Sequence, residues 1–304
     1  MATRALVLGG GGPVGIGWET GMISGFQEEG VDVTDADVII GTSAGAAVGT
    51  QIASGQTPAE LLAEQFAQLD DGAGLTVTPD MPALTAIGQK WIGGAGTDAV
   101  RAEIGALAVG AKTPSEEEWL VPFQKALLSP EWPDRRLVIT GVDTGTGEFV
   151  TWERASGVDL AHAVTASCAV PGLFPPVAID GRHYMDGGVH SVSNAQLAQG
   201  YERIVIIAAS GAGDNPYDKQ YSPPARGRGR GATRRRQHCR VLPAGRRICG
   251  GLRAEPDGCD TRPAGGRSGA AAGTRRRRAT AHRLDGRGGV AVVGPDEGAV
   301  LWAD

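Results

Sequence analysis

The stretch Val38-Ile39-Ile40-Gly41-Thr42-Ser43-Ala44-Gly45 decides how this chain folds. Its apolar start predicts a buried strand, and a run of small residues that is compatible with a helix continues to Ala53. Strand, Gly-x-Ser-x-Gly and helix, in this order, are the context of a nucleophile elbow, a tight turn that lifts a serine hydroxyl clear of a sheet. We expect Gly41 and Gly45 to lie where strand and helix approach too closely for a Cβ atom, and Ser43 to be the nucleophile.

A unit of the same kind opens the chain. It consists of a short strand, a glycine-rich loop and a helix, at residues 4–8, 9–15 and 16–29. Two consecutive strand–helix units imply neighbouring parallel strands whose following loops lie at one edge of the sheet. The glycine-rich loop should therefore face Ser43, and the backbone N–H groups of Gly11 and Gly12 are candidate donors for an oxyanion hole.

The glycine-rich loop also fits a second class of site. Gly-x-Gly-x-x-Gly after a strand is the fingerprint of dinucleotide binding. That fingerprint requires an acidic residue about 20 positions further on, at the end of the second strand. Here the second strand ends in Gly41-Thr42-Ser43. We therefore rank nucleotide binding below acyl transfer.

Alternating strands and helices continue to about residue 210. The pattern predicts a helix at 58–69, a loosely patterned lid or cap region at about 70–133, a hairpin of strands 137–142 and 148–152, a helix at 159–168, and strands at 177–179, 183–185 and 203–209. Such alternation is typical of an α/β sandwich with a mostly parallel sheet. We expect one domain over residues 1–210.

The composition changes abruptly near residue 221. Residues 1–221 carry 11 Lys and Arg against 27 Asp and Glu, whereas residues 222–304 carry 18 Arg, no Lys and 7 acidic residues. The arginines lie among Gly, Ala and Pro without a periodic apolar face, so we expect residues 222–287 to be disordered. The loss of lysine suggests an out-of-frame translation of a GC-rich gene. Residues 288–304 resemble a remnant strand and helix.

The composition also bounds the compartment and the partners. No apolar run approaches the roughly 18 residues of a membrane span, and the first apolar run is too short for a signal peptide. We expect a cytoplasmic protein that contacts membranes at most peripherally. The four cysteines lack the close pairs of a zinc site or a disulfide framework, so we expect no metal. The Arg-Gly repeats lack interleaved aromatic residues, and we rank a nucleic-acid-binding tail low.

Three ordered motifs together carry a resemblance. Gly10–Gly15, Gly41–Gly45 and Asp186-Gly187-Gly188, the last preceded by Ala169–Pro176, are similar to the motifs of the patatin-like phospholipase family. The similarity covers about residues 4–210. It implies a three-layer sandwich with helices on both faces of the sheet, hydrolysis of phospholipid or acylglycerol esters, and no cofactor.

The resemblance also implies the roles of individual residues. Ser43 would be the nucleophile, Asp186 its proton acceptor, and the loop with Gly11 and Gly12 the oxyanion hole. A free aspartate has a pKa of roughly 4, so burial would have to raise it toward about 7 for a base at neutral pH. One departure is that Pro13 and Val14 stand where many members carry a basic residue.

Two alternatives to the Ser-Asp hydrolase stay open at this point. His190 follows Asp186 by four residues and would give a Ser-His esterase or acyltransferase. The scrambled C-terminal part would leave an inactive or non-enzymatic relative if the sheet were too incomplete to align the two side chains. The acyl chain length, the head group and the oligomeric state have no signal in the sequence.

Overall fold

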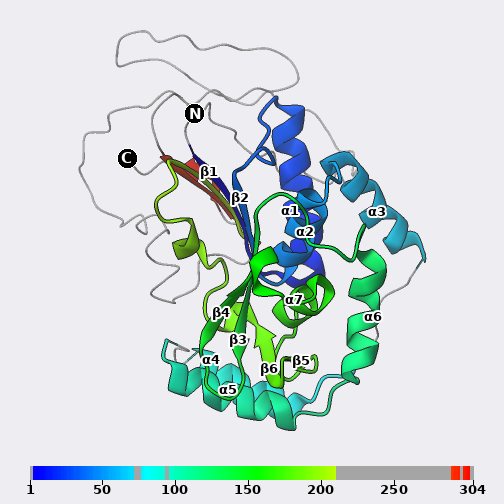
Figure 1. Cartoon of the computed structure of the whole chain (residues 1–304), viewed down its shortest axis with the longest axis vertical. Coiled ribbons are helices and arrows are strands. Elements are labelled where there is room, and N and C mark those ends of the chain that lie inside the picture. Colours follow the sequence, from blue (N-terminus) through cyan, green and yellow to red (C-terminus); the bar gives the residue numbers. More distant parts are fainter. Residues whose placement is uncertain (1–2, 72–76, 93–95, 210–288, 295–296, 302–304) are drawn as a thin grey trace, which may run out of the picture.

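The computed structural model describes residues 3–71, 77–92, 96–209, 289–294 and 297–301 (Figure 1). These residues form one mixed sheet with the strand order β5-β6-β3-β2-β1-β7-β8-β9, and β4 pairs with β3 outside this path. The strands are β1 (Arg4–Leu8), β2 (Val38–Gly41), β3 (Leu137–Asp143), β4 (Phe149–Trp152), β5 (Val177–Ile179), β6 (Arg182–Asp186), β7 (Arg203–Ile207), β8 (Gly289–Gly294) and β9 (Glu297–Leu301).

Helices lie around this sheet, as the resemblance implied. They are α1 (Gly12–Glu28), α2 (Ala44–Ala53), α3 (Pro58–Asp71), α4 (Met81–Ile92), α5 (Asp98–Gly110), α6 (Glu116–Ala126) and α7 (Leu160–Ser167), with the 3-10 turns η1 (Arg154–Ser156), η2 (Gly187–Val189) and η3 (Ala195–Ala198). The central strands β3, β2, β1, β7 and β8 run parallel, whereas β4, β5, β6 and β9 join by antiparallel pairs. The expected α/β class and the parallel centre are confirmed.

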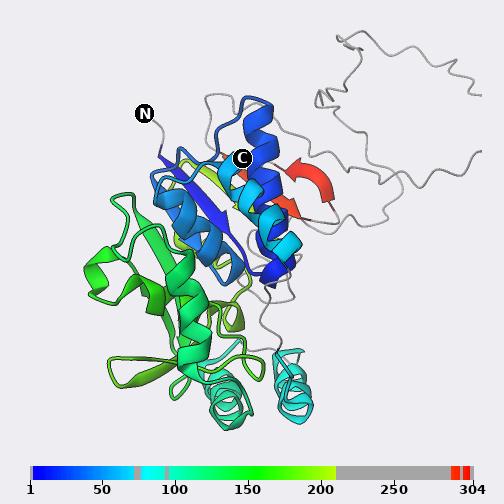
Figure 2. The same cartoon turned by 90° about the vertical axis from the view of Figure 1, so that its right-hand side faces the viewer.

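Buried side chains of the sheet alternate between two cores. Leu6, Leu8 and Ile39 face the side that α1, α2, α6 and α7 cover. Val7 and Ile40 face the opposite side, where η3 packs, and a separate cluster there joins α4 and α5 to β3 and β6. Strands that are buried on both faces need continuous apolar sequence, which is what β1 and β2 have. Figure 2 shows α1, α2 and α3 together at one end and α4 and α5 at the other.

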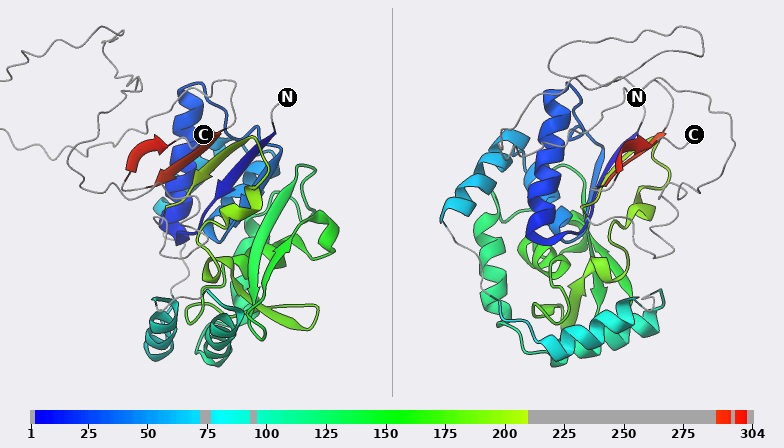
Figure 3. Two further views of the ribbon diagram at one scale, coloured as in Figure 1. Left: turned by 90° about the vertical axis from the view of Figure 1, so that its left-hand side faces the viewer. Right: turned by 180° about the vertical axis from the view of Figure 1, so that it is seen from behind.

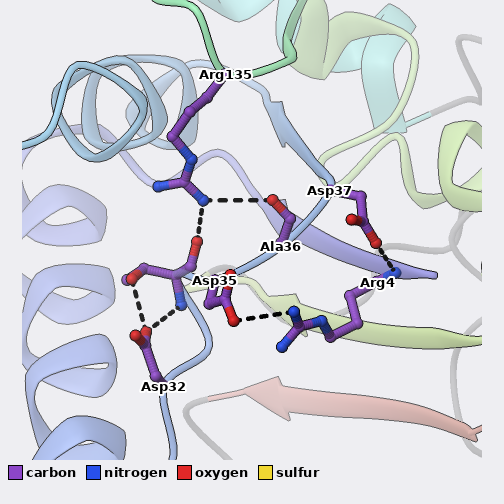
Figure 4. Close-up of polar contacts among 7 residues, drawn as sticks. Arg4, Asp32, Asp35, Ala36, Asp37 and Arg135 are labelled. Atoms are coloured by element: carbon purple, nitrogen blue, oxygen red, sulfur yellow. Dashed lines mark hydrogen bonds and ion pairs between the residues drawn. The ribbon is translucent and has the colours of Figure 1, made fainter. Parts of the chain in front are cut away.

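The end of the sheet away from the β1 and β2 loops is held by charged side chains. The backbone N–H of Arg4 donates to Asp37 Oδ2 at 2.6 Å, and the Arg4 guanidinium pairs with Asp35 at 2.9 Å (Figure 4). Arg135, just before β3, donates to the carbonyl of Ala36 at 3.3 Å. These contacts fix the chain that leads into β2 relative to both neighbouring strands.

The region at 70–133 is more regular than the sequence suggested. It contains α4, α5 and α6, with a capping box in which Ser115 and Glu118 bond to each other's backbone N–H. Pro122, a residue type that usually breaks a helix, lies inside α6. The well-capped first turn supplies the hydrogen bonds that nucleate this helix, which offsets the bond that the proline removes. The lid or cap role of this region stays a prediction.

The C-terminal expectations have mixed outcomes. Residues 222–287 lie outside the described residues. Residues 289–294 form the expected strand, which pairs in parallel with β7 (Figure 3). The prediction of a helix after this strand was wrong, since residues 297–301 form β9, which pairs antiparallel with β8. A segment this short cannot stabilise an isolated helix, whereas pairing satisfies the free edge of β8.

Candidate active site

Strand β3 brings together two residues that lie far apart in the sequence. β2 ends at Gly41, which pairs with Ile139 of β3, and β6 ends at Asp186, which pairs with Gly141. β4 pairs with the same β3 residues and so occupies the other edge of that strand. β2 and β6 therefore approach each other along one edge of β3, and the turn with Ser43 meets the end of β6.

The turn at Ser43 is strained and sterically enforced. Ser43 has φ 54° and ψ −117°, a left-handed φ that a residue with a Cβ rarely adopts, and it precedes the first turn of α2. A Cβ atom on Gly45 would stand 2.2 Å from the carbonyl oxygen of Leu8, and one on Gly41 would stand 2.5 Å from the carbonyl oxygen of Gly45. Both glycines are thus required by contact with backbone atoms, as the sequence predicted.

Two side chains at the end of α7 hold the backbone of Ser43. Its N–H donates to Ser167 Oγ at 2.9 Å, and its carbonyl oxygen accepts a hydrogen bond from the thiol of Cys168 at 3.2 Å. Burial raises the pKa of that thiol well above its ordinary value, so Cys168 stays a neutral donor. Neither contact could be predicted from the sequence, because each joins segments more than a hundred residues apart.

The side chain of Ser43 acts on the carboxyl of Asp186 as a hydrogen-bond donor and lowers its pKa. The Asp186 carboxylate also accepts the backbone N–H of Gly188 at 2.7 Å, and the residue is 3% exposed. Burial raises the pKa of Asp186 to about 7, although both hydrogen bonds act in the opposite direction. The carboxyl therefore changes its charge near neutral pH.

The glycine-rich loop lies beside Ser43. The carbonyl oxygen of Gly9 accepts the N–H of Gly45 at 2.9 Å, and a Cβ atom on Gly10 would stand 3.6 Å from Ser43 Cβ. Gly12 has φ 59° at the start of α1. Within the part of the chain that the structure describes, the amides of Gly11 and Gly12 donate to no backbone carbonyl. Two unpaired N–H groups at a helix N-terminus next to a serine suit a developing negative charge.

The motifs and the family agree. The model of the family described as patatin-like phospholipase matches residues 6–198 of the 304 residues. The chain belongs to the patatin-like phospholipase family. No curated protein sequence matches this chain.

Solved structures also include similar chains. VipD from Legionella pneumophila is 17% identical, with a TM-score of 0.41, over 72% of this chain and 52% of VipD. The type III effector protein ExoU is 20% identical, with a TM-score of 0.34, over 72% of this chain and 50% of ExoU. This patatin-like chain thus spans about half the length of each of them.

Three further observations on this patatin-like chain concern membrane spans, metal binding and the contacts of His190. Among the described helices, none is long and apolar enough to cross a bilayer. The described His, Cys, Asp and Glu side chains do not form a group of three or more that could hold a metal ion. His190 is buried, its ring Nδ1 lies 2.7 Å from Asn194 Oδ1, and its ring stacks on Phe149 at 4.1 Å. His190 thus contacts Asn194 and Phe149.

Sequence reasoning missed a buried acid in this patatin-like site. Glu19 of α1 is fully buried, and neither of its carboxyl oxygens has a hydrogen-bond partner among the described residues. Burial raises the pKa of Glu19 well above its ordinary value, and the nearby backbone of Gly9 lowers it less. The N–H of Gly9 itself donates to the carbonyl of Ile207 at 2.9 Å. Glu19 stands among apolar residues in α1, which is the one signal that the sequence offered.

Gly45→Ala should prevent the elbow from closing. A Cβ at 2.2 Å from a carbonyl oxygen forces β1 and α2 apart, and we expect a loss of stability of several kcal/mol or failure to fold. Gly17→Ala is the matched control, because a Cβ on Gly17 of α1 meets nothing within 4 Å. It should stabilise the protein by up to about 1 kcal/mol. Thermal unfolding of both variants decides, and equal melting temperatures would contradict the steric argument.

Glu19→Gln should change how stability depends on pH. The folded-state pKa of Glu19 lies above its unfolded value, so its contribution is complete below about pH 4 and is lost as pH rises through the folded pKa. We expect the melting temperature of the Gln variant to fall less between acid and alkaline pH than that of the wild type. Glu28→Gln, at an exposed position of α1, should keep the wild-type pH dependence. Parallel curves for Glu19→Gln and wild type would refute this assignment.

Proposed function

We propose that this chain is a serine acyl hydrolase that cleaves carboxylic esters of lipids, phospholipids or acylglycerols, without a cofactor. The observation that carries the proposal is the meeting of the strained turn at Ser43, at the start of α2, with the buried carboxyl of Asp186 along one edge of β3. Membership of the patatin-like phospholipase family supports lipid esters as the substrate class.

The proposed first half-reaction forms an acyl-enzyme. Ionised Asp186 accepts the hydroxyl proton as Ser43 Oγ attacks the ester carbonyl carbon. The carbonyl oxygen becomes an oxyanion, which accepts hydrogen bonds from the N–H groups of Gly11 and Gly12. When the tetrahedral intermediate collapses, the protonated Asp186 gives its proton to the departing alcohol, and the acyl group stays on Ser43.

The proposed second half-reaction releases the acid. Asp186, again ionised, accepts a proton from a water molecule that attacks the acyl carbon. The same two amides stabilise the second oxyanion. Collapse breaks the ester to Ser43 Oγ, which recovers the proton held by Asp186. A base with a pKa of about 7 is well matched to both steps at neutral pH.

The rim of the proposed site suits an apolar substrate. Val14, on the first turn of α1 and two residues after Gly12, is 81% exposed. An apolar side chain at this place offers contact to an acyl chain and adds no charge beside the oxyanion. Peripheral contact with a lipid surface and a cytoplasmic location are parts of the same proposal.

Ser43→Ala and Asp186→Asn should each abolish ester hydrolysis. Each removes one partner of a pair that acts as a unit, so we expect kcat to fall roughly a thousandfold or more. The assay uses a chromogenic ester and a phospholipid substrate. Ser54→Ala, at the other end of α2, and Asp180→Asn, in an exposed turn, are the matched controls and should keep wild-type rates. Activity retained in Asp186→Asn would end the dyad assignment.

The pH profile of kcat/KM should report Asp186. Since the base must be ionised to accept a proton, kcat/KM should rise with pH, reach half its maximum near pH 7 and then level off. Initial rates below KM between acid and mildly alkaline pH measure this curve, with enzyme stability checked at each pH. A flat profile down to pH 5 would contradict the raised pKa as the controlling property.

A further inference from the structure

One side-chain amide joins the segments that carry the two proposed reacting residues. Asn194 is 0% exposed and has a left-handed backbone, with φ 50° and ψ 34°. Its Nδ2 faces Thr42 Oγ1 at 3.0 Å, Thr140 Oγ1 at 3.3 Å, the carbonyl oxygen of Gly187 at 3.2 Å and that of Ser191 at 2.9 Å. These acceptors belong to the turn after β2, to β3 and to the turn after β6.

The orientation of this amide follows from its partners. A backbone carbonyl oxygen can only accept, so the two carbonyl partners require the NH₂ group of Asn194 at that end. The oxygen Oδ1 then faces His190 Nδ1 at 2.7 Å and must accept from it. His190 therefore carries a proton on Nδ1, and its ring is kept in place by stacking on Phe149.

The three joined segments are the ones that align Ser43 and Asp186. Thr42 directly precedes Ser43, and Gly187 directly follows Asp186. Thr42 Oγ1 and Thr140 Oγ1 also share a hydrogen bond of 2.9 Å. Asn194 Nδ2 has two N–H groups within hydrogen-bond reach of acceptors in all three segments, so it ties the turn after β2 to the turn after β6 in addition to the sheet ladder.

We propose that Asn194 is a positioning residue for Ser43 and Asp186, with His190 holding its amide in the required orientation. This inference rests on the proposed function for its effect on the reaction. Its structural part, the coupling of the two turns, stands on the contacts of Asn194 alone. His190 then acts through Asn194 and does not contact the substrate. This role gives a reason for the burial of His190, which takes no part in the proposed Ser-Asp chemistry.

Asn194→Gly is the test, because glycine accepts the positive φ and removes the whole CH₂–CONH₂ side chain that carries the amide. Asp180→Gly is the matched control, since Asp180 has φ 49° in an exposed turn. We expect Asn194→Gly to lower kcat about 100-fold while KM stays within about twofold, since misplacement of reacting groups costs rate rather than binding. Asp180→Gly should leave both constants unchanged.

A second measurement does not depend on activity. Amide hydrogen exchange followed by mass spectrometry should show faster exchange at residues 42–46 and 186–188 in Asn194→Gly, and wild-type exchange there in Asp180→Gly. If Asn194→Gly does not fold, Thr42→Val removes one acceptor of the amide without changing the side-chain shape. It should lower kcat about 10-fold and accelerate exchange in the same two segments.

The outcomes separate the two proposals. A wild type that does not hydrolyse esters, or a Ser43→Ala variant that still does, defeats the proposed function, and the exchange data still decide the coupling of the turns. An active wild type with Asn194→Gly within about twofold of its kcat defeats the positioning role. Unchanged exchange in both segments defeats the coupling.

Discussion

The relative positions of Ser43 and Asp186 depend on the pairing of strand β3 with both β2 and β6. Strand β3 pairs in parallel with β2 along its first residues and antiparallel with β6 along its last, on the same edge. One strand therefore ends where the other ends, and the residues that follow them must meet. The register, Ile139 opposite Gly41 and Gly141 opposite Asp186, sets that meeting point to within one residue pair. A slip of one residue would turn the side chain of Asp186 to the other face of the sheet.

The second constraint is the exclusion of water. Asp186 is 3% exposed, and the rise of its pKa from 3.8 to about 7 corresponds to about 4 kcal/mol of ionisation free energy. Burial imposes this cost, and the hydrogen bonds from Ser43 and Gly188 only reduce it. Glu19 adds a second buried carboxyl. Two buried carboxyls with raised pKa values lower the free energy of unfolding near neutral pH. The proton transfer proposed for Asp186 gives a reason why one of these carboxyls is buried.

The sequence predicted the parts of this site that depend on local chemistry. The strands of residues 4–8 and 38–41, the steric need for Gly41 and Gly45, and the meeting of the two loops all follow from apolar runs, glycine spacing and the rule for parallel strands. Asn194 could not be found this way. Its function depends on acceptors from three separate segments, and nothing in the residues around it signals a left-handed, fully buried amide.

The sequence predicted less helix in residues 81–126 than the structure has, for a related reason. Prolines within this region disfavour helices locally, but capping contacts and packing outweigh a single lost hydrogen bond, since α6 continues through Pro122. Prolines and caps have opposite effects on helix formation, and which effect is larger depends on tertiary contacts that cannot be read from a single sequence. The wrongly expected helix near the C-terminus has the same origin, because pairing with β8 decided that residues 297–301 form a strand.

The unusual composition beyond residue 221 raises the question of whether the sheet can hold Ser43 and Asp186 in the positions that the proposed reaction needs. The described contacts of Ser43 come from the turn after β2, from Ser167 and Cys168 at the end of α7, and from Asp186. Strand β1, which carries the glycine-rich loop, has β2 on one side and β7 on the other. All of these elements precede residue 210. An inactive relative would require the C-terminal sequence to leave the site without support. The elements that hold the site precede residue 210, and β8 adds only an outer neighbour to β7.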